Sequence, residues 1–133
     1  MAENYLKQYE ILYKKAVVDF NMAKVAFAEF EKGEIELDLE VIFFHLQQCA
    51  EKLIKAVLDF KEIRFTKTHD LALLIQLLDD NSIFIHDDIK QLIDLTDYAV
   101  EGRYAVLCED ISNAENYFKL LNEMIQSCKS CMK

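Results

Sequence analysis

The sequence predicts an all-α fold, an up-and-down antiparallel four-helix bundle with one additional short helix. Two observations lead to this prediction. The chain of 133 residues contains no proline and only two glycines, Gly33 and Gly102, and these are the residue types that interrupt helices. Apolar residues also recur at intervals of three and four, which is typical of helices that bury one face. The 53% hydrophobic content is enough for a packed core, and the length suits a single domain over residues 1–133.

The first helix is expected from about Asn4 to Lys32, with Gly33 as its C-terminal cap. Its main apolar stripe has helical spacing and consists of Tyr5, Tyr9, Leu12, Ala16, Phe20, Ala23, Phe27 and Phe30. A second, thinner line lies nearly opposite and consists of Ile11, Val18, Met22 and Val25. A helix with two apolar faces buries both, so the second line predicts contact with a partner.

The second helix has Asp38 as a possible N-cap and contains the run FFHLQQCAEKLIKAVLDF. Its broad apolar arc consists of Ile42, Phe43, Leu46, Cys49, Ala50, Leu53, Ile54 and Val57. The opposite arc is polar and consists of His45, Gln48, Glu51, Lys52 and Lys55. Phe44 and Leu58 lie within or beside this polar arc. Together with the second line of the first helix, these two apolar residues predict a homodimer interface.

Three further helices complete the predicted bundle. The short one is expected from His69 to about Leu78, with Thr68 as its cap. The fourth helix is expected from about Asp87 to Val100, and the last from about Asp110 to Lys129, each with apolar residues at helical spacing. The short connections between these segments favour antiparallel neighbours.

Charge and hydropathy limit the function. The net charge of −9 argues against strong nucleic-acid binding, which depends on neutralising phosphates with basic side chains. There is no apolar run of about 18 residues, so no membrane span is expected. The polar N-terminus lacks the apolar core of a signal peptide, and we expect a cytoplasmic protein. Cys128 and Cys131 form a C-x-x-C without further ligands nearby, so we expect free thiols at a frayed helix end, no metal site and no cofactor.

Several short motifs, taken in chain order, resemble the HEPN domain family, named for "higher eukaryotes and prokaryotes nucleotide-binding". The motifs are A-x-x-D-x-x-x-A (Ala16, Asp19, Ala23), Q-x-x-E-K-x-x-K (Gln48, Glu51, Lys52, Lys55), Thr-His-Asp-Leu (Thr68 to Leu71) and Arg103-Tyr104. The resemblance covers nearly the whole chain. It implies a four- or five-helix bundle that commonly forms homodimers. It also implies a role beside a minimal nucleotidyltransferase in a two-component system, often toxin and antitoxin.

The resemblance also indicates a binding site for a nucleotide or for the partner enzyme. Its candidate residues are Gln48, Glu51, Lys52, Lys55, His69, Arg103 and Tyr104. Some HEPN domains are metal-independent ribonucleases that use an Arg-x(4 to 6)-His motif late in the bundle. No histidine follows Arg103 in that window, and the matching spacing from Arg64 to His69 falls in a loop. We therefore predict no catalytic residue.

Three functions stay open at this point. The first is a non-catalytic or weakly catalytic HEPN component that binds a nucleotide or a partner nucleotidyltransferase. The second is a ribonuclease toxin with a degenerate active site, and the third is a purely structural homodimerisation module. A neighbouring nucleotidyltransferase reading frame would favour the first. Metal-free RNA cleavage that is lost in Arg103→Ala would favour the second, and a dimer that binds neither nucleotide nor enzyme would favour the third.

Overall fold

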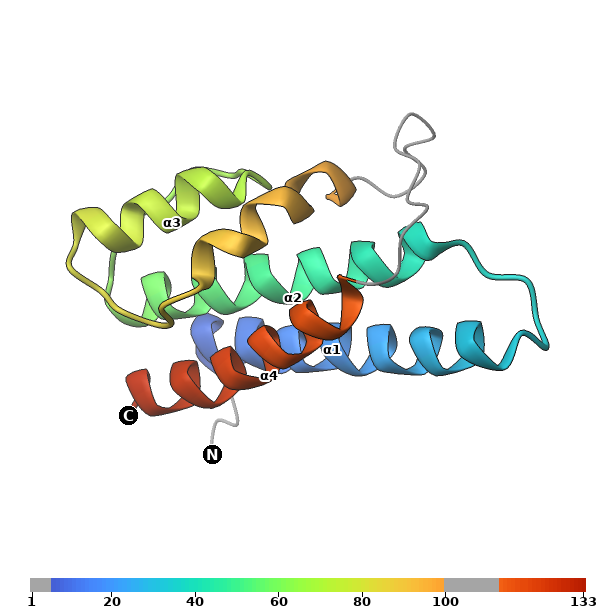
Figure 1. Ribbon diagram of the computed structural model, residues 1–133. Coiled ribbons are helices and arrows are strands. Elements are labelled where there is room, and N and C mark those ends of the chain that lie inside the picture. The colour runs from blue at the N-terminus through green and yellow to red at the C-terminus, as the bar shows by residue number, and fades with distance from the viewer. Residues whose placement is uncertain (1–5, 100–112) are drawn as a thin grey trace, which may run out of the picture.

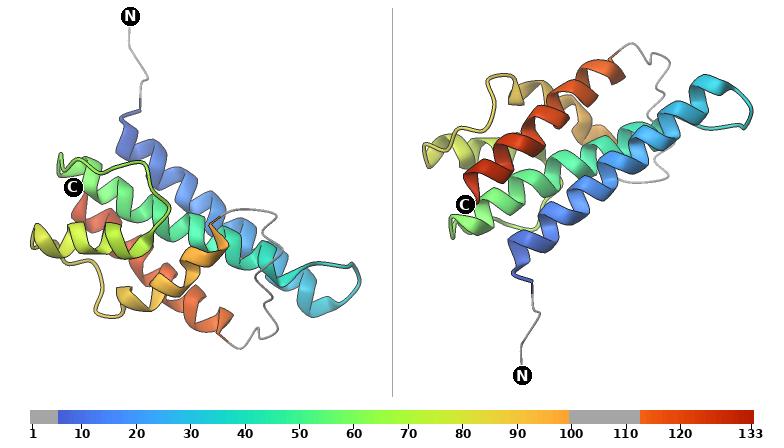
Figure 2. Two further views of the ribbon diagram at one scale, coloured as in Figure 1. Left: turned by 90° about the horizontal axis from the view of Figure 1, so that it is seen from above. Right: turned by 90° about the horizontal axis from the view of Figure 1, so that it is seen from below.

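The structure, a computed structural model, describes residues 6–99 and 113–133, and within these ranges it is all-α (Figure 1). Its elements are α1 (Gln8–Lys32), α2 (Leu39–Phe60), α3 (Leu71–Asp80), the 3-10 helix η1 (Ile89–Tyr98) and α4 (Ala114–Cys131). The predicted fold class is confirmed. Figure 2 shows α1 and α2 side by side and antiparallel, with α4 running in the same direction as α2.

Helix α2 is the centre of the bundle. It contacts all four other helices, with α1 as its most extensive neighbour. The helices α3 and η1 lie on the side of α2 turned away from α1 (Figure 1). This position explains why α2 has such a broad apolar arc: Ile42, Leu46, Leu53 and Ile54 are all completely buried. The sequence prediction of this core arc is confirmed.

The α1–α2 hairpin depends on how α1 ends. Gly33 adopts a left-handed conformation with φ 68°, and its N–H donates to the carbonyls of Glu29 and Phe30 at 3.2 Å each. Glycine adopts this conformation without the steric strain of a Cβ, so the predicted cap is confirmed. The start of α1 differs from the prediction, because Leu6 and Lys7 are described and are not helical.

The region around α3 corrects two predictions. Helix α3 is capped by Asp70, whose side chain accepts a 2.9 Å hydrogen bond from the N–H of Ala72. The helix therefore begins at Leu71, whereas the prediction placed its start at His69 with Thr68 as the cap. Thr68 instead accepts the N–H of Asp70 at 3.0 Å. The capping residue is thus Asp70, two residues after Thr68, and the helix begins correspondingly later.

The fourth element is a 3-10 helix, and the prediction of an α-helix from Asp87 to Val100 was wrong in type. Its inward residues Ile89, Leu92 and Leu95 are buried and recur every three residues. A 3-10 helix has three residues per turn, so this spacing aligns them on one face. The predicted start of the last helix at Asp110 lies outside the described residues, and α4 begins at Ala114.

The environments of Leu58 and of Cys128 also differ from expectation. Leu58 is completely buried as part of the hydrophobic core, and its carbonyl accepts the N–H of Ile63 at 2.8 Å where the chain leaves α2. Its assignment to an exposed dimer face was wrong. Cys49 and Cys128 are buried free thiols and Cys131 is partly exposed, so Cys128 belongs to the core and not to a frayed end.

None of the helices in the described part of the chain is long and apolar enough to cross a membrane.

Candidate functional site

The polar arc of α2 forms two hydrogen-bonded clusters in the fold, one around Asp19 and one around Glu51. We call the two clusters together the polar row, and it consists of Asp19, His45, Gln47, Gln48, Glu51, Lys52, Lys55 and His69. Two carboxylates anchor it, Asp19 from α1 and Glu51 from α2, and they are only 8% and 5% exposed. Carboxylates are rarely buried unless they are paired, so their partners determine what the row can do.

Asp19 connects α1 to α2. Its Oδ1 lies 3.0 Å from Nδ1 of His45, and its Oδ2 accepts a hydrogen bond from the Lys52 ammonium. On α1 this carboxylate lies between the fully buried positions Ala16 and Ala23, so it faces α2. One buried acidic side chain is thus shared by two basic groups of the neighbouring helix.

Glu51 connects α2 to the segment that precedes α3. Its Oε1 lies 2.8 Å from Nδ1 of His69, and its Oε2 accepts from the Lys55 ammonium at 3.0 Å. The Gln47 amide donates to Glu51 at 3.1 Å and to the backbone carbonyl of His69 at 3.3 Å. Gln48 in turn donates to Gln47 at 2.7 Å. These bonds hold the residues before α3 against the central helix.

The electrostatics of the row keep Glu51 ionised. Burial alone would raise the pKa of Glu51, but hydrogen bonds from His69, Gln47 and Lys55 outweigh this effect, so its pKa is lowered. Asp19 and Glu51 are balanced by Lys52 and Lys55. In the described part of the chain, every buried side-chain nitrogen and oxygen has a hydrogen-bond partner. The row is therefore a preformed and internally satisfied arrangement.

The sequence identified part of this network. Of the predicted site residues, Gln48, Glu51, Lys52, Lys55 and His69 lie together in the row, while Arg103 and Tyr104 lie outside the described residues. Their role in binding stays a prediction. The predicted site omitted Asp19, His45 and Gln47. One signal was available for Asp19, since a single acidic residue on the core side of an amphipathic helix requires a buried partner.

The second apolar line of α1 remains uncovered in the folded chain. Its residues Ile11, Val18, Met22 and Val25 are 40%, 59%, 47% and 59% exposed. Phe44 is partly buried and its ring lies 5.2 Å from that of His45 in an edge-on arrangement. The exposure that the dimer hypothesis requires is thus present on α1, and the interface itself stays a prediction.

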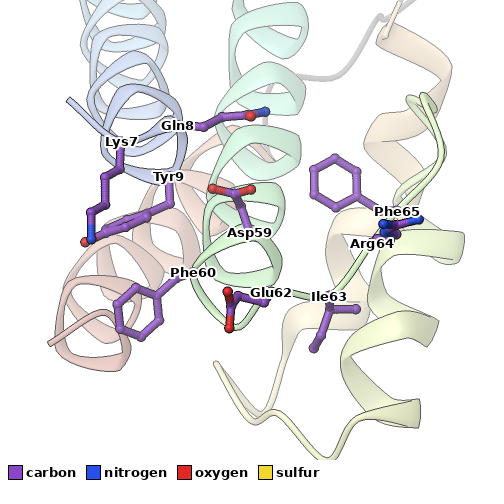
Figure 3. A pocket seen from close by; sticks show the side chains of 9 residues that line it. All are labelled: Lys7, Gln8, Tyr9, Asp59, Phe60, Glu62, Ile63, Arg64 and Phe65. Atoms are coloured by element: carbon purple, nitrogen blue, oxygen red, sulfur yellow. The ribbon is translucent and has the colours of Figure 1, made fainter. Parts of the chain in front are cut away.

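A separate pocket of about 770 Å³ lies where α1 begins and α2 ends (Figure 3). Its lining residues are Lys7, Gln8, Tyr9, Asp59, Phe60, Glu62, Ile63, Arg64 and Phe65. Charges of both signs surround it, and it contains no residue of the polar row. Arg64 lines this pocket, whereas His69 contacts Glu51 in the row. Arg64 and His69, which have the spacing of the Arg-x(4 to 6)-His motif, therefore lie in different surroundings.

Fold and site together define a class: an all-α bundle whose central helix carries a row of carboxylates paired with histidines and lysines. A family model described as the HEPN domain matches residues 9–131. This match spans nearly the whole chain and includes the entire polar row, and the chain belongs to the HEPN family. Comparison with curated proteins and with solved structures gives no match.

Proposed function

We propose that this protein is the HEPN component of a nucleotidyltransferase-linked two-component system, and that its polar row binds a nucleotide or the partner transferase. The observation that supports the proposal is the gathering of Gln48, Lys52, Lys55 and His69 on one side of α2. Ammonium, imidazole and amide groups can donate hydrogen bonds to phosphates or to acidic side chains of a protein. Their fixed partners hold them in place before a ligand arrives, which reduces the entropic cost of binding.

A homodimer is part of the same proposal. HEPN domains often dimerise, and the uncovered line Ile11, Val18, Met22 and Val25 offers a surface for a second copy. Burying apolar surface contributes roughly 25 cal/mol per Å². Val18 and Asp19 are consecutive, and consecutive helical residues point about 100° apart, so the apolar line and the Asp19 carboxylate lie on different faces of α1.

The binding proposal is tested by co-purification of the chain with the nucleotidyltransferase encoded beside it, and by calorimetric titration with nucleoside triphosphates. Lys52→Met removes the charge but keeps most of the aliphatic stem, and it should weaken binding of the ligand or partner about tenfold, the usual effect of losing one charged contact. Lys129→Met on the exposed side of α4 is the matched control and should leave binding unchanged. Equal binding by both variants, with circular dichroism showing intact folds, would contradict the proposal.

The dimer is tested by sedimentation velocity on the variant Val18→Glu with Met22→Glu. Two charges placed on the apolar line should shift the protein to monomers, because charged side chains are costly in an apolar interface. The matched control is Leu73→Glu with Gln76→Glu, which introduces two charges on exposed positions of α3. A mass that is the same for wild type and both variants would refute this interface.

A further inference from the structure

A groove of about 410 Å³ lies between α1 and α4. We call it the α1–α4 groove, and its lining residues are Phe20, Lys24 and Phe27 of α1 and Glu115, Phe118, Lys119 and Asn122 of α4. None of these residues belongs to the polar row. Small-molecule sites in proteins commonly have volumes of about 300–1,000 Å³, so the size of the groove suits a compact ligand.

The floor of the α1–α4 groove is aromatic. The ring of Phe118 lies 5.8 Å from that of Phe20 and 5.3 Å from that of Phe27, at interplanar angles of 72° and 52°. Phe20 is 7% exposed and belongs to the hydrophobic core, and the other two rings pack against this core. Each ring is therefore held by its neighbours, and the floor is an apolar surface that exists before a ligand arrives.

The charged side chains of the groove have positive charge in excess, because two lysines, Lys24 and Lys119, stand against one glutamate, Glu115. The chain as a whole has a net charge of −9, so the sign at the groove is opposite to that of the molecule. Among the residues that the structure describes, neither lysine pairs with a carboxylate. The larger pocket of Figure 3 is lined by two basic and two acidic residues and favours neither sign. The α1–α4 groove is thus complementary to an anion.

The positive charge adjoins the aromatic floor. Nζ of Lys24 lies 5.7 Å from the centroid of the Phe20 ring. A lysine placed in this way covers apolar surface with its stem and keeps its ammonium in water. Lys119 comes from the other helix, and Asn122 follows it by three residues, about one helical turn. The amide of Asn122 can donate a further hydrogen bond, so both helices offer donors to an anionic group at the groove.

The groove lies on a different face of α1 from the surfaces described above. Phe20, Lys24 and Phe27 are spaced by four and three residues and share one side of the helix. Since consecutive helical residues point about 100° apart, Phe20 points about 100° away from Asp19 and about 200° away from Val18. The groove is therefore separate from the polar row and from the predicted dimer interface.

We propose that the α1–α4 groove binds an amphipathic carboxylate, a small molecule with one carboxylate on an aliphatic or aromatic body. The body packs on the three phenylalanine rings, and the carboxylate accepts hydrogen bonds from the ammonium groups of Lys24 and Lys119. A single negative charge matches the one positive charge in excess at the groove. The second charge of a phosphate has no further cation there and meets Glu115. This site goes beyond the proposed function and does not depend on it.

The test is NMR titration of the full chain at neutral pH with octanoate and with phenylacetate, an aliphatic and an aromatic carboxylate. The backbone amide signals of residues 20–27 and 115–122 should shift and saturate. At least one carboxylate should bind about tenfold more tightly than its primary amide, which has the same body without the charge. Binding of octanoate alone identifies an aliphatic ligand and binding of phenylacetate alone an aromatic one, and either result supports the proposal.

Two double variants test the role of the lysines. Lys24→Met with Lys119→Met removes both charges and keeps most of the aliphatic stems, and it should weaken carboxylate binding about tenfold or more, to the affinity of the amide. Lys14→Met with Lys129→Met is the matched control. It removes two exposed lysines of the same two helices that do not line the groove, and it should bind as wild type.

The proposal is overturned if neither carboxylate binds, if each amide binds as tightly as its acid, or if the two double variants bind equally well. Signal shifts confined to Val18, Met22 and Val25 would show adsorption to the apolar line and would also overturn it. Tighter binding of ADP than of both carboxylates at residues 20–27 and 115–122 would make the groove a nucleotide site and would refute the carboxylate assignment.

Discussion

Substituting Glu51 by glutamine removes the negative charge at the centre of the polar row with almost no change in size. Glu51 is 5% exposed and accepts hydrogen bonds from Gln47, Lys55 and His69 at 3.1, 3.0 and 2.8 Å. The Lys55 side chain is 13% exposed, so its charge would be left without a partner in a largely buried position. Breaking a buried pair costs about 3–5 kcal/mol, and losing a hydrogen bond to a charged group about 1.5–3 kcal/mol.

Since the row reaches the surface at His69, we expect Glu51→Gln to lower the free energy of unfolding by about 2–4 kcal/mol at neutral pH. The assay is urea unfolding followed by far-UV circular dichroism, with a common m value for wild type and variant. Glu29→Gln is the matched control. Glu29 pairs with Lys32 at 3.3 Å on the exposed side of α1, and such pairs contribute about 0–1 kcal/mol. Equal effects of the two substitutions would refute the idea that the row stabilises the fold.

The pH dependence has a definite sign. The pKa of Glu51 is lowered in the folded state from its ordinary value of 4.5, so the ionised form stabilises the fold. This contribution is fully present above the ordinary value and disappears as the pH falls through the lower folded value. The difference in unfolding free energy between wild type and Glu51→Gln should therefore shrink with acidification below pH 4.5. A difference that stays constant down to the acid transition would contradict the assignment.

Three further predictions concern the fold. Leu53→Ala, at a completely buried position of α2, should cost about 2–5 kcal/mol in urea unfolding, whereas Leu73→Ala at an exposed position should cost well under that. Gly33→Ala should cost about 1 kcal/mol in the same assay, because φ is 68° and an added Cβ meets no atom within 4 Å. Burial, with a smaller effect of Cys131, raises the pKa of Cys128 to about 12, so peptide mapping after native thiol labelling should show modified Cys131 and unmodified Cys128.

The parts of the fold that could be predicted from sequence are those set by local spacing. The buried arc of α2 follows from apolar residues at intervals of three and four, because each such residue points to the same side of a helix whatever its neighbours are. The end of α1 at Gly33 was also predictable, since a glycine after a long periodic segment offers the left-handed cap. Both predictions use information contained within one element.

Predictions that depend on distant parts of the chain were less successful. Ile89, Leu92 and Leu95 are spaced by three, and this spacing fits one face of an α-helix over two turns as well as that of a 3-10 helix. Leu58 was assigned to an exposed face because it lies beside polar residues of α2, whereas it is completely buried in the core of the folded chain. In both cases packing between elements decided the outcome, and a single-helix pattern carries no information about it.

The polar row shows how the same limit affects the candidate site. The sequence placed Lys52 and Lys55 on a polar arc, and in the fold their ammonium groups pair with the buried carboxylates of Asp19 and Glu51. A polar residue in this row therefore contributes to stability as well as to any binding. Alanine substitutions there would mix the two effects. Each binding measurement on a variant of this row therefore needs urea unfolding of the same variant beside it, so that a loss of affinity is distinguished from a loss of stability.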